Sequence, residues 1–168
     1  CWFGKGKKSK LALKCIRSWR QYCPEYEVIE WNEENFDIDM NGYTRMCYAE
    51  KKYAYLSDYV RLWVVEKYGG IYFDTDVEVI RSLEELLRND AFFCFENKQY
   101  VASGLGFGSV AHGKVIQAML KEYEILLDGK NGVRMCPKLN TQALVALGLK
   151  QNGRKQNVCE AVIYPMDV

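Results

Sequence analysis

Hydrophobic and polar residues follow two different periods along the chain, and these periods predict both helices and strands. Apolar residues that recur every three or four positions predict amphipathic helices at 10–22, 53–68, 114–127 and 137–149. Short runs rich in β-branched and aromatic residues predict strands at 1–3, 26–31, 71–73, 91–95 and 158–164. A shorter helix is expected at 82–87, where glutamates follow Ser82. Because strands and helices alternate, we expect an α/β fold with a mostly parallel central sheet.

Two carboxylates follow the predicted strand at 71–73. Asp74 and Asp76 lie one residue apart at its carboxyl end, which is the edge where open α/β sheets bind ligands. In an extended segment residues i and i+2 share a face, so both side chains can converge on one point. Such a pair, with no local base, favours a hard divalent cation such as Mg²⁺ or Mn²⁺. The plainer alternative is a pair of surface acids in a turn.

The predicted helix before this strand brings two further charges toward the carboxylates. Asp58 and Arg61 are three residues apart and are therefore neighbours on one helix face. From Arg61 the helix runs about 12 Å to Gly69 at ~1.5 Å per residue. The strand then returns about 13 Å to Asp74 at ~3.3 Å per residue. We therefore expect four charged groups to meet at one end of the sheet, and the alternative is a structural Asp58–Arg61 ion pair.

The segment 57–77 resembles a known enzyme family. It contains Ser-Asp-x-x-Arg-Leu, followed by Gly-Gly-Ile-Tyr-x-Asp-x-Asp-Val. This compound motif resembles the core of the glycosyltransferases whose sugar-binding region contains a DXD motif. That family includes capsular-polysaccharide transferases, the initiating mannosyltransferases of yeast and, more distantly, the clostridial glucosylating toxins. Segments 1–4 and 31–37 share the resemblance, which extends to about residue 95 and more weakly to about residue 147.

The resemblance implies a GT-A fold, which is a Rossmann-like nucleotide-diphospho-sugar transferase fold, and the activity of a hexosyltransferase. The implied reaction moves a hexosyl unit from a nucleotide-diphosphate sugar, with a UDP-sugar favoured, to a saccharide hydroxyl. The family is regarded as metal-dependent, through Mn²⁺ or Mg²⁺, and as retaining the anomeric configuration. The implied products are polysaccharides such as capsule, or glycoconjugates.

The resemblance assigns the four charged side chains to the donor and its metal ion. Asp76 is expected to bind the ion directly, and Asp74 to share it through water or to accept a ribose hydroxyl. Asp58 and Arg61 are expected to hydrogen-bond the donor sugar, since a guanidinium offers a rigid fork to hydroxyl or phosphate oxygens. No residue of the chain identifies itself as a nucleophile.

Trp2, Tyr72 and a glycine-rich segment complete the expected donor site. By resemblance Trp2 stacks on the nucleobase, although core packing is the commoner role of a tryptophan. Tyr72 is expected to pack beneath the site. Gly104, Gly106 and Gly108 do not match the Rossmann fingerprint. We expect them to form a loop whose backbone approaches the donor sugar or the acceptor closely.

The end of the chain offers fewer candidate residues. His112 is the only histidine, and a lone histidine before a helix is more often structural than catalytic. Asn140 and Thr141 are expected to cap a helix or to touch substrate. The family usually continues to polar residues, often including a histidine, that complete the metal and phosphate site. The chain begins at Cys1 without methionine, so we expect one GT-A-like domain, residues 1–168, truncated at both ends.

Two other functions stay open. A catalytically silent module would bind a sugar nucleotide without consuming it, and turnover separates such a module from a transferase. An aspartate-dependent phosphatase would use Asp74 as its nucleophile. That class needs a later acidic pair to hold magnesium, and no such pair follows a predicted strand.

Composition narrows the partners and the compartment. A chain of 168 residues with 49% hydrophobic residues can bury a core, and its net charge of +1 does not suggest nucleic acid. The lysines at 5, 7, 8 and 10 can touch phosphates or an anionic membrane surface, although a solvated loop is the commoner role of such a run. The sequence contains no run of 18 apolar residues, so it does not predict a transmembrane helix. Seven cysteines without Cys-x-x-Cys spacing fit reduced thiols better than disulfides or zinc, so we expect a cytoplasmic protein that can contact a membrane peripherally.

Overall fold

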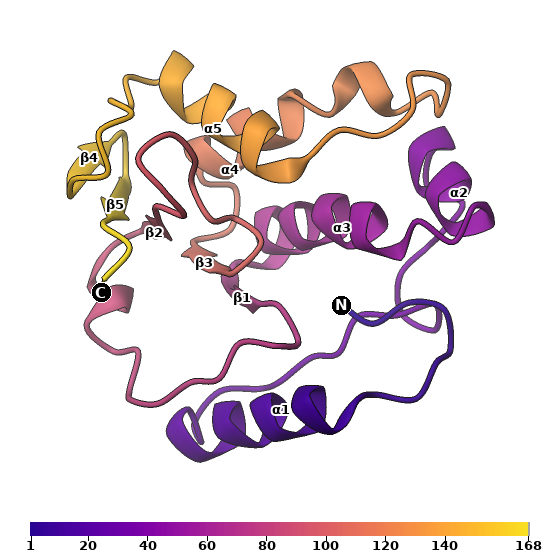
Figure 1. The fold of residues 1–168 in the computed structure, drawn as a ribbon, viewed down its shortest axis with the longest axis horizontal. Helices are drawn as coiled ribbons and strands as arrows, with labels where there is room; N and C mark the ends of the chain where they lie inside the picture. Colours follow the sequence, from indigo (N-terminus) through magenta and orange to yellow (C-terminus); the bar gives the residue numbers. More distant parts are fainter. Residues whose placement is uncertain (168) are drawn as a thin grey trace.

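A mixed sheet of five strands is the framework of the fold (Figure 1). The computed structural model describes residues 1–167. Its strands are β1 Gly70–Phe73, β2 Ala91–Cys94, β3 Gly106–Ser109, β4 Gln156–Val158 and β5 Ala161–Tyr164, in the spatial order β1-β3-β2-β5-β4. Strands β2 and β5 pair in parallel, and the other pairings in this part of the chain are antiparallel. The α/β class is confirmed, whereas the prediction of a mostly parallel sheet is wrong.

Strand β3 accounts for much of this difference, because it lies between β1 and β2 and runs antiparallel to both. Its glycines permit this position. A Cβ atom added to Gly106 would lie 2.6 Å from Cδ1 of Phe73, and one added to Gly108 would lie 2.4 Å from Cε1 of Phe92. The expectation of one glycine loop at 104–108 is therefore corrected. Gly106 and Gly108 belong to a strand whose lack of side chains makes room for aromatic rings.

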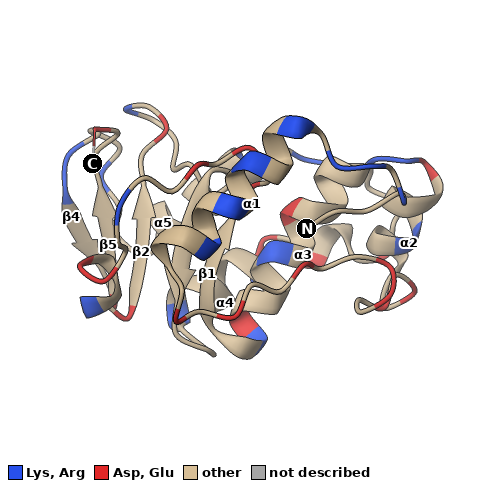
Figure 2. Ribbon diagram, turned by 90° about the horizontal axis from the view of Figure 1, so that it is seen from below, with Lys and Arg blue, Asp and Glu red and all other residues tan. Residues whose placement is uncertain are grey.

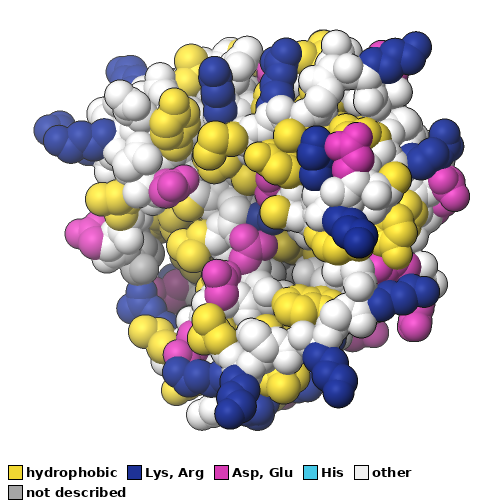
Figure 3. Space-filling view, turned by 45° about the vertical axis from the view of Figure 1, so that its right-hand side comes forward, with side chains coloured by type: hydrophobic (Ala, Val, Ile, Leu, Met, Phe, Trp, Pro, Cys, Tyr) yellow, Lys and Arg dark blue, Asp and Glu magenta, His cyan; other side chains and the backbone are white. Residues whose placement is uncertain are grey.

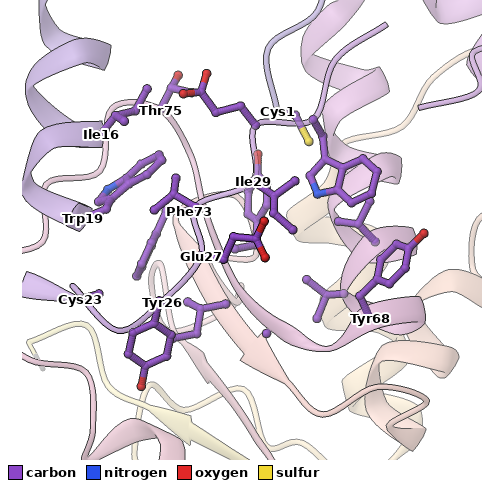
Figure 4. Close-up of a pocket in the computed structure, with 18 of the residues that line it drawn as sticks. Cys1, Ile16, Trp19, Cys23, Tyr26, Glu27, Ile29, Tyr68, Phe73 and Thr75 are labelled. Atoms are coloured by element: carbon purple, nitrogen blue, oxygen red, sulfur yellow. The ribbon is translucent and has the colours of Figure 1, made fainter. Parts of the chain in front are cut away.

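Segments 1–3 and 26–31 contain no strand, so the strands predicted there are not formed. The backbone N–H of Trp2 donates to the carbonyl of Trp31 at 2.8 Å, and no other backbone bond joins the two segments within the described residues. A cavity of about 220 Å³ lies between 26–31 and β1, and Ile29 and Phe73 both line it (Figure 4). Paired strands lie only about 4.8 Å apart, so two segments with this cavity between them do not form the parallel pairing that the sequence predicts.

The described part of the chain contains five α-helices. They are α1 Lys10–Tyr22, α2 Gly42–Ala49, α3 Tyr53–Tyr68, α4 Lys114–Lys121 and α5 Cys136–Ala146. The predictions at 10–22 and 53–68 are confirmed. The helix predicted at 82–87 is reduced to a 3₁₀ turn at Leu86–Arg88, and the one predicted at 114–127 ends at Lys121 before a second 3₁₀ turn.

Local signals explain where the two well-predicted helices begin and end. The Ser9 side chain accepts a hydrogen bond from the N–H of Ala12 and caps α1. Gly69 follows the last residue of α3 with a φ of 69°, a conformation that favours glycine, and the chain turns there into β1. This turn sets the position of β1 relative to α3, and with it the position of the residues that follow β1.

Helix α3 runs between two outer layers (Figure 1). Helices α4 and α5 lie on one side of it, and α1 lies on the other side of the molecule. Phe93 and Phe107 stack in the core of the sheet with ring centroids 5.3 Å apart. None of the helices in residues 1–167 combines the length and the apolar character that crossing a bilayer requires.

Candidate active site

The end of β1 and the middle of α3 bring three charged side chains together. Asp74 directly follows β1, whereas Asp58 and Arg61 lie on α3. Nη2 of Arg61 lies 2.9 Å from Oδ1 of Asp58 and 3.1 Å from Oδ1 of Asp74. Three of the four expected charged groups therefore meet, whereas Asp76 forms no hydrogen bond or ion pair with them within the described residues. The roles of all four toward a donor stay predictions.

Backbone carbonyls occupy the other donors of the buried Arg61 guanidinium. Nε donates to the carbonyl of Ser57 at 3.1 Å, and Nη1 donates to the carbonyls of Gly104 at 3.0 Å and Ser103 at 3.3 Å. Gly104 lies directly against the network, since a Cβ there would be 3.4 Å from Nη1 of Arg61 and 3.6 Å from Oδ2 of Asp74, which are ordinary contact distances. A buried guanidinium with this many acceptors is held in one position.

Tyr72 lies against the same network from β1. Its hydroxyl donates to Oδ1 of Asp74 at 2.7 Å, and its ring centroid lies 4.6 Å from Cζ of Arg61. Burial raises the pKa of Tyr72 well above its usual range, so the hydroxyl keeps its proton and remains a donor. Asp74 thus accepts from Tyr72 at one oxygen and from Arg61 at both.

The charged form of Asp58 is disfavoured by burial. Burial raises its pKa above the ordinary value, and both Arg61 and the thiol of Cys136 act in the opposite direction. Asp58 and Asp74 together carry two negative charges against the single positive charge of Arg61. A partly buried site with one uncompensated negative charge favours a cation or a group that donates hydrogen bonds.

Asp76 differs from Asp74 in its exposure and in its bonded partners. It is exposed, and within the described residues its carboxylate forms no ion pair. The chain after it is fixed to α1, because Nε1 of Trp19 donates to the carbonyl of Val77 at 2.8 Å and the N–H of Val79 donates to Oγ of Ser18 at 2.9 Å. Asp76 is therefore a free carboxylate on a segment that is anchored immediately after it.

Trp2 is only partly exposed, and it lines the cavity shown in Figure 4. Its Nε1–H donates to the carbonyl of Gly6 at 2.7 Å, and Nζ of Lys8 lies 5.9 Å from the ring. The indole is thus oriented by its own loop and is not sealed in the core. Stacking of Trp2 on a nucleobase stays a prediction.

Helix α5 holds the loop that binds Arg61, a role that sequence analysis does not predict. Nδ2 of Asn140 donates to Oγ of Ser103 at 2.7 Å, and the N–H of Val101 donates to Oγ1 of Thr141 at 2.9 Å. The thiol of Cys136, at the start of α5, lies near Asp58 and acts to lower the pKa of that carboxyl. In the sequence, two polar residues at 140–141 within a predicted helix were the only indication of this role. The sequence does not show that they bind the segment 101–103.

His112 lies apart from this network. Its Nδ1 is 3.0 Å from Oε1 of Glu66, and its backbone N–H donates to the Glu66 carbonyl at 2.8 Å. Glu66 belongs to the second half of α3, beyond Arg61. These contacts fix the loop after β3 to α3, as the expected structural role requires.

Asp74 and Asp76 are the side chains here that can bind a divalent ion. Residues 1–167 contain no group of three or more His, Cys, Asp or Glu side chains arranged to hold a metal by themselves. Magnesium and manganese sites that include substrate phosphates and water need only one or two protein carboxylates. Zinc usually takes three or four nitrogen and sulfur ligands. The donor set therefore fits Mg²⁺ or Mn²⁺ and does not fit zinc.

Comparison with known proteins gives one family and several relatives. The family model described as the glycosyltransferase sugar-binding region containing the DXD motif matches residues 9–93, just over half of the chain. The inositol phosphoceramide mannosyltransferase 3 of Schizosaccharomyces pombe is 34% identical over 73 residues, which are 41% of this chain and 20% of that protein. The α-1,4-N-acetylglucosaminyltransferase of Homo sapiens is 32% identical over 101 residues, which are 57% of this chain and 27% of that protein.

A solved structure also resembles the fold. The PaToxG glycosyltransferase superposes with a TM-score of 0.69 at 17% sequence identity, covering 86% of this chain and 66% of that one. At this identity the likeness concerns the fold alone. The curated relatives are much longer than the matched region, since the matches span 20% and 27% of their length.

Proposed function

Because the chain belongs to the family of glycosyltransferases whose sugar-binding region contains a DXD motif, we propose that it transfers a hexosyl unit from a nucleotide-diphosphate sugar to a saccharide hydroxyl. A UDP-sugar is the favoured donor, the anomeric configuration is retained, and the fold is of the GT-A type. The names of the two relatives, a mannosyltransferase and an N-acetylglucosaminyltransferase, support a hexosyl or related donor. The products are polysaccharides or glycoconjugates.

The contrast between Asp74 and Asp76 carries this proposal. Both oxygens of Asp74 are bonded to Arg61 or Tyr72, whereas Asp76 is exposed and free of ion pairs in the described chain. Two acids one residue apart, with one fixed and one free, suit a site that receives its last ligands from outside. We assign Asp76 as the direct ligand of Mn²⁺ or Mg²⁺, and Asp74 as a partner through water or a ribose hydroxyl.

A bound divalent ion would act as a Lewis acid on the diphosphate that leaves. The contribution of the chain is to orient the donor. Arg61 and Tyr72 hold Asp74 in one rotamer, so its position does not have to be fixed when the donor binds. The bonds from Trp19 and Ser18 likewise hold the segment that follows Asp76.

Asp58 is the residue we assign to the donor sugar. Its side chain is 14% exposed, so a sugar hydroxyl can reach it, and its uncompensated charge favours such a donor. Arg61 is more deeply buried, and carbonyls and carboxylates already occupy its donors. We therefore propose that Arg61 positions Asp58 and Asp74, and contributes less by direct contact with the sugar.

Turnover of sugar nucleotides tests the proposal. The full chain is incubated with UDP- and GDP-hexoses and simple saccharide acceptors, with and without Mn²⁺, and free nucleoside diphosphate is measured. Release that depends on both metal and acceptor is expected for one donor class. Asp76→Asn should abolish the metal-dependent affinity for the nucleotide without lowering the melting temperature, because the Asp76 side chain forms no hydrogen bond or ion pair in residues 1–167.

Asp90→Asn is the matched control, since Asp90 is also an exposed aspartate but precedes β2. It should behave as the unmodified chain. Metal-dependent nucleotide binding that survives Asp76→Asn, measured by calorimetry, would contradict the assignment. Binding without release for every donor and acceptor would instead identify a silent sugar-nucleotide module.

A further inference from the structure

Positive charge is concentrated in the first 24 residues. They contain seven of the 23 lysines and arginines and none of the 22 aspartates and glutamates, although the whole chain has a net charge of only +1. Figure 2 shows the result on α1, whose ribbon carries several basic positions and no acidic one. Three of the seven pair with acids from later in the chain, Lys8 and Arg20 with Glu30 and Lys14 with Glu78. The other four cations form no ion pair within residues 1–167. Such asymmetry is typical of a surface that binds an anionic partner.

The helical repeat places part of this charge in one stripe. Lys10, Lys14 and Arg17 follow one another at spacings of four and three residues, so they lie on the same face of α1. All three are exposed. Lys14 pairs with Glu78 at 2.6 Å, whereas Lys10 and Arg17 have no ion-pair partner in residues 1–167. At least two cations of the stripe are thus available to an external anion.

Two leucines flank this stripe. Leu11 is 53% exposed and Leu13 is 45% exposed, although α1 buries Ala12, Cys15 and Ile16 on its opposite face. Figure 3 shows basic side chains along the lower edge of the molecule, at the height where α1 lies in Figure 1, with hydrophobic side chains exposed among them. Packing within the chain does not explain these two leucines, because the buried face of α1 is already complete without them.

We propose that the basic face of α1, formed by Lys10, Leu11, Leu13, Lys14 and Arg17, docks on the surface of an anionic lipid membrane. Helices that lie in a membrane interface combine Lys and Arg with aliphatic side chains that enter the boundary of the acyl chains. A nucleic acid would pair with the cations but would leave the leucines in water. An anionic lipid membrane can bind both the cations and the exposed leucines of α1.

The opposite face of α1 links this surface to the acidic pair. Trp19 and Ser18 bind the backbone of Val77 and Val79, directly after Asp76. A membrane on the basic face would lie about one helix diameter, ~10 Å, from that segment. If the proposed transferase function holds, this geometry favours an acceptor saccharide that is carried on a membrane lipid. The docking itself does not depend on that function.

Sedimentation with vesicles tests the docking. The full chain is mixed at low salt with phosphatidylcholine vesicles that contain about 30% phosphatidylserine, or none. Binding to the anionic vesicles alone is expected, and added salt should weaken it. The double variant Lys10→Glu, Arg17→Glu should lower the affinity about tenfold or more. Leu11→Ser, Leu13→Ser should lower it severalfold, because the aliphatic contribution is lost.

The double variant Lys150→Glu, Arg154→Glu removes the same charge from exposed positions near β4, and its affinity should stay unchanged. Melting curves establish that each variant is folded, and Lys10→Gln, Arg17→Gln replaces the charge reversal if that variant unfolds. Equal binding to neutral vesicles, or equal losses in the control and in the α1 variants, would overturn the proposal. So would full affinity in the leucine variant. Loss of turnover with intact vesicle binding would contradict the transferase function and leave the docking standing.

Discussion

Helix α3 holds two polar contacts of nearly the same length, and they differ in their surroundings. Near the middle of α3, Nη2 of Arg61 lies 2.9 Å from Oδ1 of Asp58, and the two side chains are 4% and 14% exposed. Near its C-terminal end, Oε1 of Glu66 lies 3.0 Å from Nδ1 of His112, whose ring is charged only when it is protonated, and the exposed fractions are 21% and 68%. Distance between the charged atoms thus does not distinguish the pairs. Burial does, because water screens one pair and not the other.

Because of this difference in burial, the Asp58–Arg61 pair is a candidate binding site, whereas the Glu66–His112 pair only connects the loop after β3 to α3. Arg61 belongs to a network that retains a negative charge, so a ligand can complete it. Glu66 accepts from His112 and from Gln117 at the surface, where water satisfies whatever charge remains. The only histidine of the chain therefore belongs to the pair that needs no ligand.

The largest expected effect is on stability, from Arg61→Met. This substitution leaves Asp58 and Asp74 buried without their cation, and breaking a buried pair in this way costs about 3–5 kcal/mol. For a domain of this size that corresponds to a fall in melting temperature of roughly 6–20 °C. Thermal unfolding followed by circular dichroism measures it.

Arg45→Met is the matched control, because Arg45 also lies 2.9 Å from an aspartate, Asp39, but the two side chains are 62% and 76% exposed. Its cost should stay below about 1 kcal/mol. Equal losses from the two substitutions would remove the distinction between buried and exposed pairs on which the site assignment rests.

The second effect concerns ligand affinity, from Asp58→Asn. If Asp58 accepts a sugar hydroxyl, the variant should bind free nucleoside diphosphate almost normally and bind the sugar nucleotide more weakly, by up to about 2–5 kcal/mol. Burial raises the pKa of Asp58, so the selectivity of the unmodified chain should fade as the pH drops through that raised value. Titration calorimetry with both ligands at several pH values measures both effects.

A structural role for Asp58 would give another pattern. Both ligands would then weaken together, and the melting temperature would fall with them. That outcome would return the Asp58–Arg61 pair to the same class as Glu66 and His112.

The sequence predicts the Arg61 network in part, because part of it depends on local geometry. The rise of α3 and of β1 suffices to bring Asp74 level with Asp58 and Arg61. The carbonyls of Ser103 and Gly104 lie 42 and 43 residues beyond Arg61 in the chain. No periodicity within α3 or β1 contains that information, so this half of the network was visible only in the structure.

The order of the strands in the sheet likewise depends on contacts between distant segments, which the sequence does not show. Composition predicts that β1 and β2 are strands, but it does not say that β3 lies between them. That position depends on Gly106 and Gly108 meeting the rings of Phe73 and Phe92, which is a contact between distant segments. Segment 26–31 has the composition of a strand, but a single backbone hydrogen bond from Trp2 does not make it one.

A smaller effect is expected from Trp2→Ala, which tests the exposed side of the site. Stacking of an aromatic side chain on a base is worth about 1–3 kcal/mol, so nucleotide affinity should fall about tenfold or more. Trp31→Ala is the control, because Trp31 already stacks on Tyr68 with centroids 5.6 Å apart. Fluorescence titration with a nucleoside diphosphate measures both. A Trp2 variant with unchanged affinity would exclude base stacking.

The smallest effect is expected from Glu66→Gln, in the exposed pair. The hydrogen bond from His112 is the main reason that the pKa of Glu66 lies below its ordinary value of 4.5. A carboxylate with a lowered pKa stabilises the fold above the unfolded value, and that contribution disappears as the pH falls through the folded value. The variant should therefore be less stable at pH 7 by under about 1 kcal/mol. Urea midpoints of the two chains should converge as the pH falls below 4.5, since Glu66 then becomes protonated and resembles glutamine. A difference that grew on acidification would reverse the sign of this argument, and a loss as large as that of Arg61→Met would show that solvent does not screen the pair.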